Sequence, residues 1–141
     1  MIITETSAKW QGKMAFQASL NGHKFFLDAE EKHGGQNKGV RPKPLLLTSL
    51  AGCTGMDVVS ILNKMRIKNY EFNIEVKGYL TEEHPKYYHK IDLFFNFKGS
   101  ALPEDKIKKA IELSQTRYCG VTTMLQKAAQ IQYFINIEEE V

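Results

Sequence analysis

The sequence is poor in cysteine: it holds two, Cys53 and Cys119, in 141 residues. A secreted domain held together by disulfides would usually carry more, so the sequence argues against that class of protein. In a reducing compartment, two thiols are either inert core residues or a redox pair. The function of the chain depends on which of these two alternatives holds.

Several ligand-binding patterns are also missing. The two cysteines and four histidines form no CxxC or HxxxH spacing, so the sequence predicts no metal site and no cofactor. The glycine-rich stretch GGQNKG lacks the Lys-Ser/Thr ending of a phosphate-binding loop. A net charge of +3, with the basic residues spread along the chain, gives no reason to expect a nucleic-acid partner.

Long apolar runs are missing too. No segment reaches about 18 uninterrupted apolar residues, so no membrane-spanning helix is expected. The first residues, MIITETSAKWQGK, have no basic stretch followed by an apolar one, so we expect no signal peptide and a cytoplasmic location. With 43% hydrophobic and 25% charged residues, the composition is that of a globular protein, and we predict a single domain over 1–141.

Two periodicities are present in this chain. Alternation of apolar and polar residues predicts strands at about 2–10, 14–20, 23–28, 70–77, 91–98 and 130–138. Helical spacing predicts a long helix at about 43–67 whose first half is deeply buried, a helix that Pro103 opens, and a short one at about 120–129. Asn21-Gly22 predicts a hairpin turn. The order βββ-α-ββ-αα-β, with its strands in groups, predicts an α+β fold.

The surroundings of the two cysteines are unusual. Asp57 follows Cys53 by one turn on the same face of the long helix, where a carboxylate is costly unless it pairs with a cation or a backbone N–H. Cys119, in RYCGVTTML, is placed to cap the short helix, and helix N-termini stabilise a thiolate. The competing interpretation is that these are buried, space-filling thiols of raised pKa.

Two stretches together, PKPLLLTSLAGCTGMDVV and RYCGVTTML, resemble the OsmC/Ohr family of osmotically inducible and organic hydroperoxide resistance proteins. CTGMDVVSIL is similar to a less characterised subgroup of OsmC-like proteins. The resemblance implies a long central helix, an intertwined homodimer and active sites at the subunit interface. It also implies a two-cysteine peroxidase that acts on organic hydroperoxides in oxidative stress defence. Cys53 would then be the peroxidatic thiol, Cys119 the resolving thiol, and a lipoyl-type dithiol the reductant.

The sequence departs from that family at the groups that activate the thiol. The family's peroxidases carry a glutamate nine residues before the reactive cysteine, where this chain has Pro44. They also carry an arginine in the N-terminal strands, whereas this chain has none before Arg41. Lys13 or Arg41 could supply the cation, and Asp57 could organise it. The alternative function is a non-enzymatic dimer that binds a small apolar ligand or senses redox state.

Overall fold

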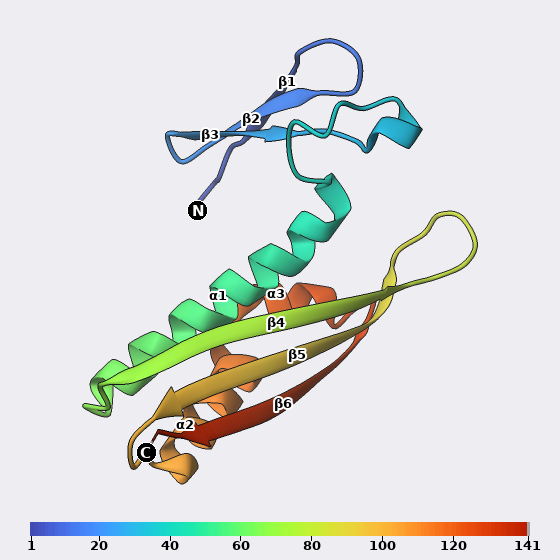
Figure 1. Ribbon diagram of the computed structural model, residues 1–141. Helices are drawn as coiled ribbons and strands as arrows, with labels where there is room; N and C mark the ends of the chain where they lie inside the picture. The colour runs from blue at the N-terminus through green and yellow to red at the C-terminus, as the bar shows by residue number, and fades with distance from the viewer. Residues whose placement is uncertain (141) are drawn as a thin grey trace. The chain divides into compact units, whose positions relative to one another are not determined.

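The computed structural model describes residues 1–140, which form two compact units, Met1–Leu46 and a second that begins at Leu47. The first unit contains an antiparallel sheet in the order β1-β2-β3, followed by a short 3-10 helix, Glu31–His33 (Figure 1). Its strands are β1 (Ser7–Trp10), β2 (Phe16–Leu20) and β3 (His23–Leu27).

The hairpin predicted from Asn21-Gly22 is confirmed. Both residues have left-handed backbones, with φ of 51° and 78°, as a two-residue turn between twisted strands requires. The first strand begins at Ser7 and is therefore shorter than predicted. Ser7 pairs with Ser19, one residue before β2 ends, so β2 is too short to pair with the residues at the start of the chain.

A carboxylate organises the loop that follows β3. Asp28 is buried, and its two oxygens accept hydrogen bonds from the backbone N–H groups of Ala29, Gln36 and Lys38, at 2.7, 3.2 and 3.1 Å. These bonds, led by the one from Lys38, hold the pKa of the Asp28 carboxyl below its ordinary value. The loop therefore has a fixed conformation that depends on a charged acceptor.

The second unit is a sheet with helices on one face (Figure 1). Its strands are β4 (Tyr70–Leu80), β5 (Tyr88–Gly99) and β6 (Gln130–Glu139), antiparallel between β4 and β5 and parallel between β5 and β6. A parallel pair needs a long crossover, which here contains α2 (Glu104–Leu113), a π-helical turn (Ser114–Tyr118) and α3 (Gly120–Leu125). The α+β prediction is confirmed.

The core of this unit lies between the sheet and the helices. It contains Leu50, Val58, Leu62, Ile91, Leu93, Phe95, Phe97, Ile107 and Ile111. The inward residues of β5 alternate as the sequence predicts. Each buried side chain of this size contributes about 1.5–3 kcal/mol by leaving water. The core therefore fixes the position of α1 (Pro42–Lys64) against the sheet.

The prediction that α1 is deeply buried in its first half is wrong for this chain. The buried residues of α1 form one stripe four residues apart, Leu50, Thr54, Val58 and Leu62. The residues on its other faces remain accessible, and Met56 is 76% exposed. Apolar residues surround α1, but the sheet covers only one side of it. The helix also ends at Lys64 rather than near residue 67.

Within residues 1–140, α1 is the one helix long and apolar enough, by length and composition alone, to cross a membrane. The sequence predicted no such helix because polar residues interrupt its apolar run. Core helices of globular proteins pass the same test, and the buried stripe of α1 belongs to the core. Only 22% of the apolar stretch of α1 is buried within the single chain, so most of this stretch is accessible at the surface. The cytoplasmic location stays a prediction.

Removing one acceptor oxygen from Asp28 should loosen its loop. An amide offers one oxygen where the carboxylate offers two, so Asp28→Asn is expected to speed amide hydrogen exchange at Gln36 and Lys38. Because the pKa of Asp28 is lowered in the folded protein, the ionised carboxylate stabilises the fold fully above the ordinary carboxyl pKa. This stabilisation of the fold is lost as pH falls through the lowered pKa. Glu31→Gln, at an exposed acid of the same loop, is the control. Equal protection in all three proteins would contradict this role.

Candidate functional site

Three side chains from two parts of the chain meet beside α1. Cys53 and Asp57 project from successive turns of the helix, and Cys119 lies between the π-helical turn and α3. The two Sγ atoms and a carboxylate oxygen all lie within 4.8 Å of one another. Cys53 and Asp57 are half-buried, and Cys119 is 2% exposed. The structure therefore brings three of the five predicted site residues together.

Cys119 lies in an environment that favours the thiolate. It is the N-cap of α3, and its Sγ accepts hydrogen bonds from the N–H of Thr122 and the hydroxyl of Thr54, both at 3.3 Å. Burial alone would raise the pKa of the Cys119 thiol. The hydrogen bonds from Thr122 and Thr54 outweigh burial, and the pKa lies below its ordinary value. The predicted cap is confirmed, and it stabilises negative charge.

Cys53 lies in the opposite environment. Burial, the hydrogen bond that it shares with Cys119 and the charges of Cys119 and Asp57 all raise the pKa of the Cys53 thiol. A backbone hydrogen bond from Val121 opposes them only in part. Of the two thiols, Cys119 is thus the first to ionise, while Cys53 keeps the proton between them.

A buried polar chain supports Cys119. The side-chain amide of Gln115 donates to the Thr54 hydroxyl at 3.2 Å and accepts from the Thr122 hydroxyl at 3.4 Å. All three side chains are buried. Sequence reasoning missed this chain, since Gln115 and Thr54 are 61 residues apart. A weak signal was present, because Thr54 is a polar residue in the apolar stripe of α1.

The partner of Asp57 is neither of the two predicted kinds. Its Oδ2 accepts a hydrogen bond from the Ser114 hydroxyl at 3.2 Å, from the first residue of the π-helical turn. π-Helical turns inside α-helices occur often at functional sites. Ser114 continues the inward face of α2, and the wider turn that begins there changes the phase of the helix, so Tyr118, four residues later, is 53% exposed.

The two proposed cations lie in the first unit. Arg41 donates to the Gly39 carbonyl at 2.9 Å and to the Asn37 side chain at 2.8 Å. Lys13 has a left-handed backbone, with φ of 50°, and its carbonyl accepts from the Trp10 indole. Their part in activating a thiol stays a prediction. Lys64, which sequence reasoning missed, lines a 110 Å³ pocket together with Asp57 and Tyr118.

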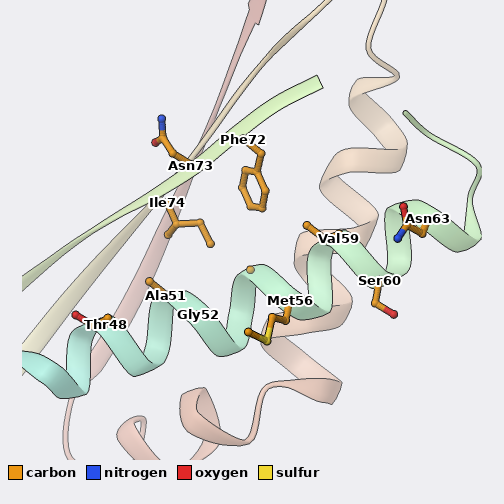
Figure 2. Close-up of a pocket in the computed structure, with 11 residues that line it drawn as sticks. Thr48, Ala51, Gly52, Met56, Val59, Ser60, Asn63, Phe72, Asn73 and Ile74 are labelled. Atoms are coloured by element: carbon orange, nitrogen blue, oxygen red, sulfur yellow. The ribbon is translucent and has the colours of Figure 1, made fainter. Parts of the chain in front are cut away.

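A larger groove lies along another face of α1, between this helix and β4. It has a volume of about 670 Å³ and is lined by Thr48, Ala51, Gly52, Gly55, Met56, Val59, Ser60, Asn63, Phe72, Asn73 and Ile74. Figure 2 shows Phe72 and Ile74 of β4 reaching toward the helix. Gly55 allows this approach, since a Cβ there would lie 3.2 Å from Ile74 Cδ1. The groove is mainly apolar.

Comparisons with known proteins identify the family of the chain. The model of the OsmC-like protein family matches residues 35–134. The chain belongs to the OsmC-like family. Protein YhfA of Escherichia coli K12 is 30% identical over 128 residues, which cover 90% of this chain and 92% of YhfA.

Solved structures show the same fold. A hypothetical protein from Aquifex aeolicus VF5 superposes with a TM-score of 0.87 at 26% identity, covering both chains completely. An organic hydroperoxide resistance protein from Elizabethkingia anophelis superposes with a TM-score of 0.67 at 14% identity, over 99% of this chain and 98% of that one. The OsmC/Ohr fold is therefore shared with proteins named for hydroperoxide resistance.

Replacing the Thr54 hydroxyl should raise the pKa of Cys119. In a Cys53→Ser background, which leaves Cys119 as the one thiol, Thr54→Val removes a hydrogen bond that the thiolate accepts. Ultraviolet absorbance of the thiolate, followed against pH, measures the change. Thr48→Val, at an exposed position of α1, should leave the titration unchanged. If Thr54→Val titrates like its parent, the hydroxyl does not stabilise the thiolate.

Proposed function

We propose that this protein is a two-cysteine thiol peroxidase that reduces organic hydroperoxides and uses a dithiol as the reductant. The observation that carries the proposal is the approach of the two Sγ atoms, within 4.8 Å of each other, in a chain with no other cysteine. A disulfide can form there with small side-chain movements. The family fold, shared with proteins named for organic hydroperoxide resistance, supports the choice of substrate.

The difference in exposure between the two thiols supports different roles for them in this proposal. Cys53 is half-buried, whereas Cys119 is almost completely covered. A peroxide therefore meets Cys53 first. Cys119, whose pKa is lowered, is well suited to the second step, because attack on a sulfenic acid requires a thiolate. Cys53 is thus the peroxidatic cysteine and Cys119 the resolving cysteine.

The reaction proceeds in two balanced steps. Cys53 Sγ attacks the terminal peroxide oxygen, the O–O bond breaks, and the alcohol leaves with the proton that the Cys53 thiol gives up. Cys53 is then a sulfenic acid. Cys119 Sγ attacks Cys53 Sγ, forming the disulfide and releasing water. A dithiol outside the protein reduces this disulfide and is itself oxidised to a disulfide.

Asp57 acts as the base in the first step. The raised pKa of Cys53 means that its proton must be removed during attack, and the Asp57 carboxylate is within 4.8 Å of Cys53 Sγ. Ser114 holds that carboxylate in place. Lys64, which lines the same pocket as Asp57, is a further candidate for the missing cation, beside Lys13 and Arg41.

A second copy of the chain is the proposed occupant of the groove on α1. The groove is apolar, and Met56 at its edge is 76% exposed, which is unusual for a protein that stays monomeric. Small residues along it, Ala51, Gly52 and Gly55, leave room for close packing of another helix. This agrees with the homodimer that the family resemblance implies.

The self-association of the chain can be tested at Met56. Sedimentation equilibrium should show a wild-type dimer, and Met56→Lys should shift it to monomer by placing a charge in the buried interface. Met124→Lys, at a methionine of α3 that is 64% exposed, is the matched control and should remain dimeric. A wild-type monomer at micromolar concentrations would contradict the dimer and favour a small apolar ligand in the groove.

Turnover of cumene hydroperoxide with dihydrolipoamide tests the reaction. Cys53→Ser should lose turnover by at least about 100-fold, because no nucleophile remains. Cys119→Ser should stop after the first step, leaving Cys53 one oxygen atom heavier by mass spectrometry. Wild-type protein that is folded but no more active than Cys53→Ser would favour a ligand-binding or redox-sensing dimer.

Asp57→Asn separates two roles of the carboxylate. Loss of its negative charge should lower the pKa of Cys53, which by itself would raise the rate at neutral pH. If Asp57 also takes the Cys53 proton, the rate should instead fall, by about 100-fold, as when a general base is removed. The pH dependence of kcat/KM measures both effects. An increased rate at neutral pH would show that Asp57 is not the base.

A further inference from the structure

The thiol site also has the donor set of a metal centre. We propose that the reduced protein binds one thiophilic divalent cation of the zinc class through Cys53, Cys119 and Asp57, with a fourth position open to solvent or ligand. Neither the family match nor the relatives' names assign a metal to this site. The sequence analysis predicts no metal site, because the spacing of these ligands follows no zinc motif.

The distances fit tetrahedral coordination. Zinc lies about 2.3 Å from thiolate sulfur and about 2.0–2.2 Å from a carboxylate oxygen, which places neighbouring donor atoms about 3.5–3.8 Å apart. The three donor atoms here already lie within 4.8 Å of one another. Cys53 and Asp57 lie one turn apart on α1, a spacing that directs both to one point. Side-chain movements of about 1 Å therefore bring the three donor atoms to the separations that zinc requires.

The groups around the donors suit a bound cation. Ser114 donates to the Asp57 oxygen, and the Thr54 hydroxyl and Thr122 N–H donate to Cys119 Sγ. Metal ligands in proteins are commonly oriented by outer hydrogen bonds of this kind. These bonds exist before any ion arrives, so the ligands are already oriented.

The chemistry of the donors selects the ion. Two sulfurs favour zinc and its soft relatives over magnesium and calcium, which prefer oxygen. Among residues 1–140, no fourth His, Cys, Asp or Glu belongs to the cluster. Zinc sites that hold a fold together have four protein ligands, whereas three ligands leave a position open. We therefore expect an exchangeable ion, one that the folded chain does not require.

Bound cation and disulfide exclude each other. Binding displaces the thiol protons of Cys53 and Cys119, moves no electrons, and uses a lone pair of each sulfur. A ligated Cys53 cannot attack a peroxide, and a Cys53–Cys119 disulfide cannot bind the ion. If the proposed peroxidase function holds, the cation protects and inhibits the reduced enzyme. This last consequence rests on the proposed function, but ion binding itself does not.

Zinc titration of the reduced full-length chain, in competition with a chromophoric chelator, tests the proposal. One ion should bind per chain, and Co²⁺ in its place should give thiolate-to-metal absorption in the near ultraviolet. Cys53→Ser and Cys119→Ser should abolish that absorption. Asp57→Asn should weaken zinc binding by at least about 10-fold. Asp105→Asn, at an exposed acid of α2, is the matched control.

Two controls keep the outcome clear. Wild-type protein oxidised to the disulfide has the same sequence and should bind no zinc at this site. Equal binding by reduced and oxidised protein, or full affinity in Asp57→Asn, would overturn the three-ligand site. Zinc binding by a protein that shows no peroxidase turnover when it is free of metal would overturn the proposed function and leave this inference standing. Peroxidase turnover by a reduced protein that binds no zinc would overturn this inference and leave the proposed function standing.

Discussion

The hydrogen bond from the Thr54 hydroxyl to Cys119 Sγ, 3.3 Å long, is the contact on which the rest of the site depends. It joins the buried stripe of α1 to the N-cap of α3, across 65 positions of sequence. Because Thr54 follows Cys53 directly, the bond also brings Cys53 against Cys119. Together with the hydrogen bonds from Thr122, the same bond lowers the pKa of the Cys119 thiol, so this contact contributes both to the approach of the two thiols and to the acidity of Cys119.

The π-helical turn makes that contact possible. Ser114–Tyr118 continues α2 with a wider turn. Ser114 keeps the inward face of Ile107 and Ile111 and reaches Asp57. Beyond it, Gln115 enters the core between Thr54 and Thr122, and Tyr118 faces outward. A regular helix would hold Ser114 and Tyr118 on one face. The irregular turn therefore converts a core-facing stripe into a support for two reactive groups.

The sequence predicts what depends on local pattern and fails where contacts are distant. Alternation located the strands, Asn21-Gly22 the hairpin, and the position of Cys119 its capping role. Helical spacing places Ser114 on the inner face of α2, but it could not show that this residue meets Asp57, which is 57 positions away. The sequence analysis overestimates the burial of α1. Apolar residues show which faces of a helix can be buried, but the position of the sheet determines which face is buried in the fold.

The faces of α1 explain how one helix can serve stability, chemistry and association. Leu50, Val58 and Leu62 close the core. Cys53 and Asp57 lie to one side of that stripe, and Ala51, Gly55 and Val59 lie to the other, along the groove. Each set projects from a different side of α1, and Cys53 also packs against the core. Because these faces are separate, the groups that activate the thiol can change while the core and the thiol pair are retained. Pro44 is an example, since it stands where the peroxidases that this chain resembles carry a glutamate. The chemistry of this fold can therefore vary without any change to what stabilises it.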